Sequence, residues 1–500
     1  MSAMGATGNG SGTTTGTVTS QPGLAGALAL PRGRRGAELI MLAFAIGVVL
    51  FAYANVGLGL NGRVPTGLAT YGVLFGVLML GAHLAVRKLA PWADPLLLPL
   101  AALLNGLGLV MIYRLQESGR NGNPGNAIST MSASTTTFQL MWSTIGVIAF
   151  VAVLLVIREP RTLQRYTYTL GAIGLVLLAL PALLPSSISE VPGTGAKIQV
   201  AIGGFSIQPE EFAKLALAVF FAGYLVAKRD VLALAGRHVL GIALPRARDM
   251  GPVLIAWAAS LLVLVFESDI GTSALFFGMF LIMLYVATQR TSWLLIGTSL
   301  FLVGAWAASK LVSHVGVRFA IWLHPFTYAN VFCGASSVRV PCVPSYQLAQ
   351  GIYGLGFGGL LGTGLGHGQP YLTPLVQSDF IITAFGEELG LTGLMALLLI
   401  YGLIVQRGLR AAVAVRDPFS KLLAGGLAFV VALQVFVIVG GVTQLIPLTG
   451  ITTPFLSQGG SSLVASWMLI ALLMRISDTA RRPAPQPIQD EGMTQVVRGI

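Results

Sequence analysis

The sequence of 500 residues is 55% apolar and only 10% charged, a composition typical of a chain whose main solvent is lipid. Its net charge of +12 is compatible with nucleic-acid binding. However, the basic residues are distributed one loop at a time between apolar segments, which is what orientation in a membrane requires. The composition therefore predicts a polytopic membrane protein and argues against a nucleic-acid-binding protein.

The chain begins with a segment rich in Gly, Ser, Thr and Ala that lacks the basic start of a signal peptide. We predict that residues 1–37 form a disordered cytoplasmic tail. Residues 476–500 contain prolines and mixed charges, and we predict a second flexible cytoplasmic tail there.

Apolar windows of about 20 residues, which cross roughly 30 Å of hydrocarbon, predict an all-α, polytopic integral membrane bundle of about 12 transmembrane helices. An even number keeps both termini on one side. The predicted spans are 38–60, 67–86, 94–113, 138–157, 167–185, 209–227, 251–266, 270–288, 292–311, 380–404, 421–446 and 462–475.

Most of the 30 basic residues fall in alternate loops, so the positive-inside rule places those loops and both termini in the cytoplasm. The remaining large loops, 115–136, 186–208 and 312–379, are then extracellular. The last of these holds both cysteines, Cys333 and Cys342. On an oxidising face a disulfide is favoured over two free thiols.

Two site classes find little support in the sequence. The Gly-rich segment 354–366 lacks the Lys-Ser/Thr ending of a nucleotide-binding P-loop. The histidines nearest to the cysteines show no zinc-ligand spacing with them. Any chemistry is therefore expected to run without ATP hydrolysis by this chain.

Ionisable residues at membrane depth are candidates for functional sites, because burying them requires a partner or a hydrated cavity. Pro209 is well placed to begin a helix, with Glu210 and Glu211 near its positive end and Lys214 on the same face. Two interpretations remain open: a self-neutralised helix start, or the polar wall of a substrate cavity.

Two further places have equally simple explanations. Glu267 and Asp269 lie at a helix break, where a loop is as good an explanation as a site. Arg318 is an isolated cation in an apolar, aromatic segment, where it could be an interfacial anchor.

The segment "SDFIITAFGEELGLTG" places Asp379 at the external end of the tenth span, with Glu387 and Glu388 about 12 Å deeper along the helix. Asp379 is either a helix cap or a functional carboxylate. Gly386 and Gly390 allow neighbouring helices to approach the two glutamates, which could pair with Lys214 or an arginine.

Five ordered motifs resemble signatures of the SEDS family, which includes RodA, FtsW and SpoVE. They are "FSIQPEEFAK", "SDIGTS", "YQLAQGIYGLGFGGLLGTGLGHG", "SDFIITAFGEELGLTG" and "PLTGITTPFLSQGGSS". The resemblance runs from about residue 95 to 475 and implies a core of ten helices at 94–475, including the extracellular loop 312–379. Two extra N-terminal helices at 38–93 make the chain similar to the actinobacterial RodA-type branch.

The resemblance implies a peptidoglycan glycosyltransferase that polymerises lipid II on the outer face of the plasma membrane with a class B penicillin-binding protein, a transpeptidase. The family's essential acid corresponds to Asp379, and a carboxylate at a hydrated membrane edge can serve as general base for a sugar hydroxyl. Elongation is favoured over division. A lipid II flippase and a non-catalytic morphogenesis scaffold remain alternatives.

We expect Arg318 and Lys214 to stabilise the pyrophosphate leaving group, with a divalent cation (Mg²⁺ or Mn²⁺) as a further candidate. No ligand cluster in the sequence marks a metal site, and no cofactor is established. The remaining substrate-binding candidates are Glu211, Gln208, Tyr346, Gln347, Glu387 and Glu388.

The chain departs from the family pattern at several positions, which puts local substrate contacts in question. Glu210 replaces a small Ser, and Gln458 replaces an aromatic residue. The other departures are Gln199, where a Trp is common, Ala201, at an often basic position, and His324, where an Asp is frequent.

Overall fold

The computed structural model describes most of the membrane core. The described residues are 35–120, 135–189, 197–202, 205–232, 235–239, 242–245, 251, 254–255, 257–259, 269–326, 332–333, 340–341 and 343–483. Most of the predicted N-terminal tail, residues 484–500 of the predicted C-terminal tail, most of the predicted span 251–266, and Cys342 lie outside them. Residues 476–481, predicted as tail, form the end of α15.

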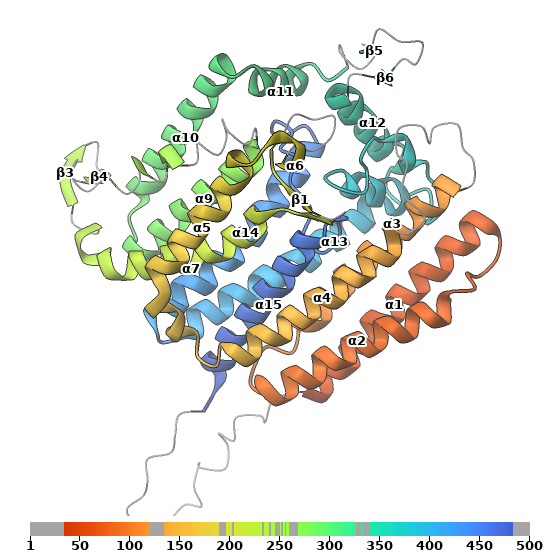
Figure 1. The fold of residues 1–500 in the computed structure, drawn as a ribbon, viewed down its shortest axis with the longest axis horizontal. Coiled ribbons are helices and arrows are strands. Elements are labelled where there is room, and N and C mark those ends of the chain that lie inside the picture. The colour runs from red at the N-terminus through yellow and green to blue at the C-terminus, as the bar shows by residue number, and fades with distance from the viewer. Residues whose placement is uncertain are drawn as a thin grey trace, which may run out of the picture. The chain divides into compact units, whose positions relative to one another are not determined.

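The fold is a bundle of long helices (Figure 1). The long helices are α1 (Arg35–Asn61), α2 (Leu68–Leu89), α3 (Leu97–Arg120), α4 (Thr135–Val156), α5 (Thr167–Leu183), α7 (Pro209–Leu232), α9 (Ile270–Thr288), α10 (Thr291–Leu311), α13 (Ile381–Ala414), α14 (Pro418–Val442) and α15 (Gly460–Arg481). Shorter helices are η3 (Pro160–Tyr166), α6 (Ser186–Ser189), α11 (Ser313–Leu323), α12 (Val343–Gly358) and η5 (Pro370–Leu372).

Three antiparallel two-stranded hairpins lie in the connections and are the described exceptions to the expected all-α architecture. They are β1 (Val200–Ile202) with β2 (Phe205–Ile207), β3 (Ala235–Val239) with β4 (Ile242–Pro245), and β5 (Phe332–Cys333) with β6 (Val340–Pro341).

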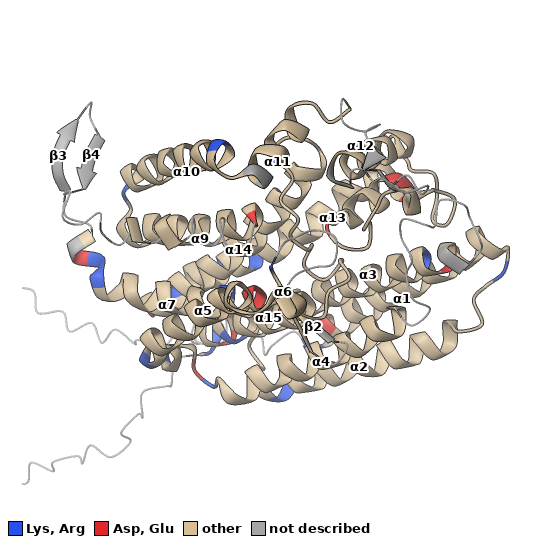
Figure 2. Cartoon of the chain, turned by 45° about the horizontal axis from the view of Figure 1, so that its top comes forward, with Lys and Arg blue, Asp and Glu red and all other residues tan. Residues whose placement is uncertain are grey.

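Within the described residues, ten helices are long and apolar enough to cross a membrane, and each coincides with a predicted span. The predicted span 209–227 forms α7, whose 24 residues reach about 36 Å. Charged residues at both of its ends interrupt its apolar character. The polytopic helical fold is therefore confirmed, and Figure 2 shows how few charges the helices carry along their lengths.

Helix boundaries follow local chemistry. Asp269 caps α9 by accepting hydrogen bonds from the amides of Gly271 (2.8 Å) and Thr272 (3.1 Å). Asp417 caps α14 in the same way through the amide of Ser420 at 2.9 Å. Helix α13 changes direction at Gly390, whose φ of 67° is in the left-handed region that glycine adopts freely.

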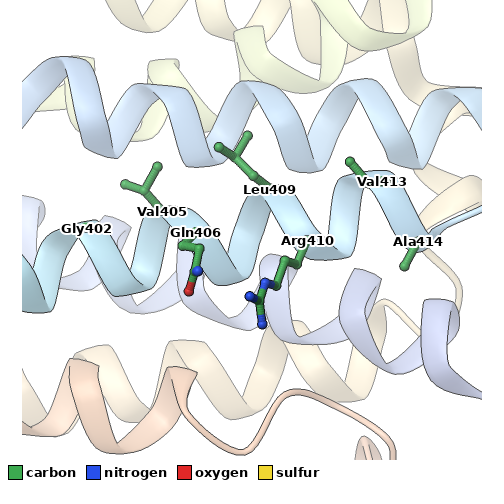
Figure 3. A pocket seen from close by; sticks show the side chains of 7 residues that line it. All are labelled: Gly402, Val405, Gln406, Leu409, Arg410, Val413 and Ala414. Atoms are coloured by element: carbon green, nitrogen blue, oxygen red, sulfur yellow. The ribbon is translucent and has the colours of Figure 1, made fainter.

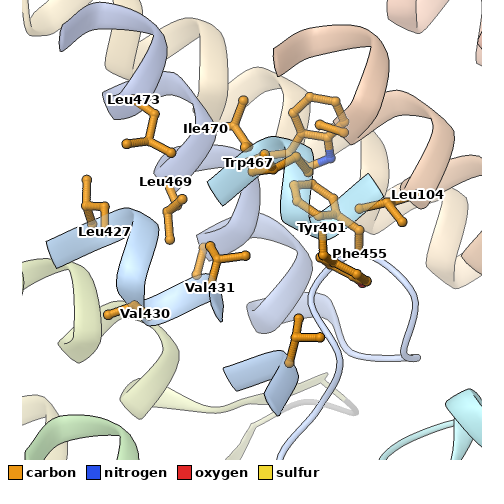
Figure 4. Packing of buried hydrophobic residues seen from close by; sticks show 14 of the residues in the cluster. Leu104, Tyr401, Leu427, Val430, Val431, Phe455, Trp467, Leu469, Ile470 and Leu473 are labelled. Carbon is orange, nitrogen blue, oxygen red and sulfur yellow. The ribbon is translucent and has the colours of Figure 1, made fainter. Parts of the chain in front are cut away.

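The core of the bundle lies around α15 (Figure 4). The indole of Trp467 packs edge-on against Phe150 and Phe455, with ring centroids 5.6 and 5.4 Å apart. By contrast, Ile40, Phe44 and Phe51 on α1 are each 72% exposed, as expected for side chains that face lipid.

The predicted extracellular loop 312–379 contains more helix than expected. Helices α11 and α12 and the short η5 lie within it, and the turn that carries Asp379 follows them. The described part of this loop therefore consists largely of short helices.

Candidate active site

Asp379 lies in the turn directly before α13, and its side chain is half-buried. Its Oδ1 accepts hydrogen bonds from the Ser378 hydroxyl (2.9 Å) and from the Gln347 side-chain amide (3.4 Å). Gln347 also donates to the carbonyl of Pro374 at 2.9 Å, which fixes its orientation. The N-cap residue of α13 is Phe380, so the structure does not support the helix-cap interpretation of Asp379.

The positive charge of Arg318 acts on Asp379 in the direction that lowers its pKa. Its Nη1 donates to the carbonyl of Thr449 at 3.0 Å, which orients the guanidinium. Burial raises the pKa of Asp379 above its ordinary 3.8, while the Ser378 hydrogen bond and the positive charge of Arg318 only partly oppose this rise. Arg318 also acts on Asp269, whose pKa burial raises as well.

Asp269 and Glu210 share one hydroxyl group. The Thr272 Oγ1 lies 2.8 Å from Asp269 Oδ2 and 3.1 Å from Glu210 Oε2. A hydroxyl has a single proton to donate, so it satisfies only one of the two carboxylates at a time. The start of α7 and the start of α9 therefore meet at two acidic groups that compete for one donor.

Lys214 and Glu211 form a buried ion pair one turn apart on α7. Lys214 also donates to Gln434 Oε1 at 3.2 Å, and Gln434 donates to the carbonyl of Thr452 at 2.8 Å. A small cavity lies beside this pair, lined by Glu210, Glu211, Lys214, Thr272, Leu275, Phe276, Gln434 and Ile451. The structure therefore shows the self-neutralised pair. The cavity beside it has room for about one water molecule, and the substrate-cavity interpretation stays a prediction.

We call Asp379, Arg318, Asp269, Glu210, Glu211 and Lys214 the acidic site. Its members come from α7, α11, the turn before α13 and the N-cap of α9. Thr272 connects Asp269 to Glu210, next to the Lys214 pair, and the positive charge of Arg318 acts on both Asp379 and Asp269.

Glu387 and Glu388 lie apart from the acidic site. Glu388 pairs with Arg114 of α3, and both side chains are buried. Glu387 accepts a hydrogen bond from the backbone amide of Gln369 at 2.5 Å. The arginine partner that the sequence left unnamed is therefore Arg114, and Lys214 pairs elsewhere.

Two other predicted binding residues lie at the edge of the site. Gln208 lies directly before α7, and its backbone amide donates a hydrogen bond to the Ser461 hydroxyl at 3.1 Å. Tyr346 is partly exposed beside Gln347 on α12. Both positions are compatible with contact to a ligand at the outer helix ends.

The sequence profile of the FtsW, RodA and SpoVE cell cycle proteins matches residues 95–482. The chain belongs to this family. Helices α1 and α2 precede the matched region.

Relatives of the chain are known across this family. A peptidoglycan glycosyltransferase RodA from Mycobacterium tuberculosis is 48% identical over 454 residues, covering 90% of this chain and 92% of that protein. The stage V sporulation protein E of Bacillus subtilis is 30% identical and covers 80% of this chain and 100% of its own. The crystal structure of the Thermus thermophilus rod shape determining protein RodA has a TM-score of 0.51 at 21% identity, covering 78% and 98% of the two chains, which shows the shared fold.

The family and the ten apolar helices establish the chain as a multi-pass protein of the bacterial plasma membrane. The departures from the family pattern can also be located. Gln199 accepts a hydrogen bond from the Ser206 hydroxyl at 2.6 Å across the β1–β2 hairpin, in which Ala201 also lies. The backbone amide of Gln458 donates to the backbone carbonyl of Gln377 at 2.7 Å, and His324 is the C-cap residue of α11.

Sequence reasoning missed Arg114, Thr272 and Gln434 as members of these polar contacts. Arg114 carried a usable signal, because it is a lone cation within an apolar helix. Thr272 and Gln434 carried none, since uncharged polar residues are common in membrane helices.

The metal and disulfide predictions remain open. Among the described residues, no group of three or more His, Cys, Asp and Glu side chains could hold a metal ion, so we derive no step through one. Cys333 lies in β5, paired with Val340 of β6, whereas Cys342 lies outside the described residues.

A separate groove lies along the second half of α13 (Figure 3), lined by Gly402, Val405, Gln406, Leu409, Arg410, Val413 and Ala414. All seven residues come from one helix, and most of their lining surface is apolar. The groove contains no carboxylate, and we do not assign it to the chemistry of the acidic site.

Proposed function

We propose that this protein is a peptidoglycan glycosyltransferase of the RodA type, which polymerises lipid II into glycan strands for cell elongation. The observation that carries the proposal is Asp379, a half-buried carboxyl group directly before α13 that Ser378 and Gln347 orient and whose pKa burial raises, in a chain of the FtsW, RodA and SpoVE family. A raised pKa makes the ionised form of this carboxyl group a stronger base than an ordinary aspartate.

In the proposed reaction, Asp379 accepts the proton of the 4-hydroxyl group of the GlcNAc in an incoming lipid II. The oxygen attacks the anomeric carbon of the MurNAc at the lipid-linked end of the growing glycan. A new carbon–oxygen bond forms as the bond to pyrophosphate breaks, so undecaprenyl pyrophosphate leaves with the electron pair and the α anomer becomes β.

The leaving group is already good, so it requires cations rather than a general acid. Arg318 is oriented by the Thr449 carbonyl and lies on the same side of the bundle as Asp379. We assign it the stabilisation of the departing pyrophosphate. Lys214 is held by Glu211 and Gln434, and we assign it a supporting role deeper in the site.

Gln347 orients Asp379, and Gln208 and Tyr346 border the sugar path. We propose that Glu387 and Glu388 act indirectly, by holding residues 363–369 through hydrogen bonds with their backbone amides. The proposed orientation has cytoplasmic termini and an external active site. It is supported by the basic loops and by the position of Asp379 at the end of α13 opposite Arg407 and Arg410.

The first test compares lipid II polymerisation by the purified protein, with its class B penicillin-binding protein partner, for the wild type and Asp379→Asn. Asparagine keeps the size and removes the base, so we expect a rate about 10²- to 10⁴-fold lower. Asp230→Asn, at an exposed aspartate near the end of α7, is the matched control and should retain full activity.

Normal polymerisation by Asp379→Asn would show that the base lies elsewhere. Absence of polymerisation by folded, partner-bound wild type would reject the glycosyltransferase proposal in favour of a flippase or a scaffold.

A further inference from the structure

Helix α1 lies outside the region matched by the family, yet it contacts the segment that leads to Asp379. That segment connects α12 to α13, and we call residues 362–369 the glycine loop. The contact raises the question of what α1 contributes to the site.

The contact is made by two glycines. A Cβ added at Gly59 of α1 would lie 2.4 Å from the Leu365 carbonyl oxygen and 3.2 Å from the Cα of Gly366. Reciprocally, a Cβ on Gly366 would lie 3.1 Å from the Val56 carbonyl oxygen and 3.2 Å from the Cα of Gly59. The two backbones therefore touch where neither residue has a side chain.

Helix α1 is itself firmly placed. At its middle, Gly106 of α3 faces Val49 so closely that an added Cβ would lie 2.4 Å from it. Nearer the glycine loop, the ring of Tyr53 lies 4.7 Å from that of Tyr71 on α2 and 4.5 Å from that of Tyr113 on α3.

The far end of α1 is also anchored. The guanidinium of Arg35 donates to the carbonyl of Ala90 at 2.6 Å and to that of Ala93 at 3.1 Å, beside its ion pair with Glu38. Helix α1 is thus a fixed support rather than a loosely attached segment.

The glycine loop is bonded in turn to the first turns of α13. The amides of Thr363 and Gly364 donate to the carbonyls of Glu387 and Glu388 at 3.0 and 2.9 Å. The carboxylate of Glu387 accepts from the Gln369 amide at 2.5 Å.

Arg114 completes this connection from α3. Its Nη2 donates to the Gly368 carbonyl at 2.6 Å, and it pairs with Glu388. Helix α13 begins at Ile381, directly after the turn that carries Asp379, so a shift of the glycine loop would reach Asp379 through the first two turns of α13.

From these contacts we propose that α1 is a positioning element for the active site, and that Gly59 holds the glycine loop and, through α13, Asp379 in their working geometry. The catalytic part of this proposal rests on the proposed function. A displacement of about 1 Å at a reacting group can cost about 10²-fold in rate. A backbone contact that fixes the glycine loop is therefore expected to have a measurable effect on kcat.

The test is Gly59→Ala in the full-length protein bound to its transpeptidase partner. The matched control is Gly47→Ala on the same helix, where an added Cβ meets nothing within 4 Å. Both changes raise helix propensity alike. We measure kcat and KM for lipid II polymerisation, and hydrogen exchange of peptides that cover the glycine loop.

We expect Gly59→Ala to lower kcat about 10-fold or more with little change in KM, and to speed exchange at Thr363 and Gly364. Gly47→Ala should match the wild type in both measurements. Equal behaviour of the two variants would overturn the proposal, as would faster loop exchange without loss of kcat in an active enzyme.

A second pair of variants covers the case in which Gly59→Ala does not fold. Leu365→Ala removes a partly buried loop side chain without introducing a clash, and Leu361→Ala is its control because Leu361 is 82% exposed. Only the first should lower kcat and speed loop exchange, and equal results for both would reject the buttress.

The outcome separates the two proposals. If the wild type does not polymerise lipid II, the proposed function fails, and the exchange measurement alone decides whether α1 holds the loop.

Discussion

The acidic site and a second charged region, at the opposite end of α15, are built on contrasting charge balances. We call the second region the basic end cluster, which consists of Asp94, Asp478, Arg407, Arg475, Arg481 and Arg482. There, two carboxylates meet four arginines. In the acidic site, four carboxylates meet one arginine and one lysine.

The carboxylates of the basic end cluster are fully satisfied. Asp478 lies 2.9 Å from Arg482 and 3.7 Å from Arg475, and it also accepts a hydrogen bond from the Trp92 amide at 2.8 Å. Arg475 donates to the Leu89 carbonyl at 2.6 Å. The cluster ties the segment before α3 to the end of α15, and its arrangement is that of a structural anchor.

The acidic site leaves its negative charge only partly compensated. The positive charge of Arg318 acts on both Asp379 and Asp269, and the Thr272 hydroxyl lies within hydrogen-bond distance of both Asp269 and Glu210. Burial accordingly raises the pKa values of Asp379 and Asp269. The contrast is one of charge balance: arginines outnumber carboxylates in the anchor, whereas carboxylates outnumber cations in the acidic site, as expected where protons and ligands exchange.

We expect the largest effect on stability and activity when a cation is removed from the acidic site. Lys214→Met leaves Glu211 buried without its partner, which costs about 3–5 kcal/mol in the free energy of unfolding. Polymerisation by the remaining folded protein should fall as well. Chemical denaturation in detergent and a lipid II polymerisation assay measure the two effects.

The control for this variant is Lys421→Met, because Lys421 is exposed on α14 and its loss should change neither quantity. A Lys214→Met protein as stable as the wild type would mean that the ion pair contributes nothing to folding.

Removing charge from the basic end cluster should separate stability from activity. Asp478→Asn keeps an oxygen for the Trp92 amide but loses the ion pairs with Arg475 and Arg482, which costs about 1–3 kcal/mol in the free energy of unfolding. The polymerisation rate per folded molecule should stay unchanged. A fall in that rate, measured at a temperature where the variant is fully folded, would contradict the role of a pure anchor.

The membrane helices could be predicted from the sequence because apolar windows report directly on the solvent that surrounds them. Buried charges could be predicted as site candidates for the same reason, and Asp379, Glu211 and Lys214 were found in this way. The partner of each buried charge could not be predicted. The positive charge of Arg318 acts on Asp269 and Asp379 from another segment of the chain, and such long-range proximity leaves no periodic pattern in the sequence.

Helix α12 shows why the extracellular layer was harder to predict. The segment was predicted as part of the loop 312–379 because it lies between two predicted spans, and its glycines each disfavour a helix by about 1 kcal/mol. Packing against α13 overrides this preference. A Cβ at Gly358 would lie 2.1 Å from the Gly386 carbonyl oxygen, and one at Gly354 would lie 2.9 Å from Glu387 Oε2. The same glycines that weaken the helix allow it to approach α13.

The smallest predicted effect is the pH dependence that Asp379 gives to activity and to stability. Because burial raises the pKa of Asp379 above its ordinary 3.8, the fraction of ionised base increases as pH rises through the folded-state value, and kcat/KM should increase by at most about 10-fold per pH unit. Folding stability should change in the opposite direction. The folded state holds the Asp379 proton more tightly than the unfolded chain, so this contribution is complete below pH 3.8 and is lost as pH rises through the folded pKa.

A pH series of both quantities for the wild type and Asp379→Asn tests the assignment. The variant should lose the Asp379 contribution to both slopes, and a wild-type rate that is flat across this range would remove Asp379 as the base and with it the functional contrast with the basic end cluster.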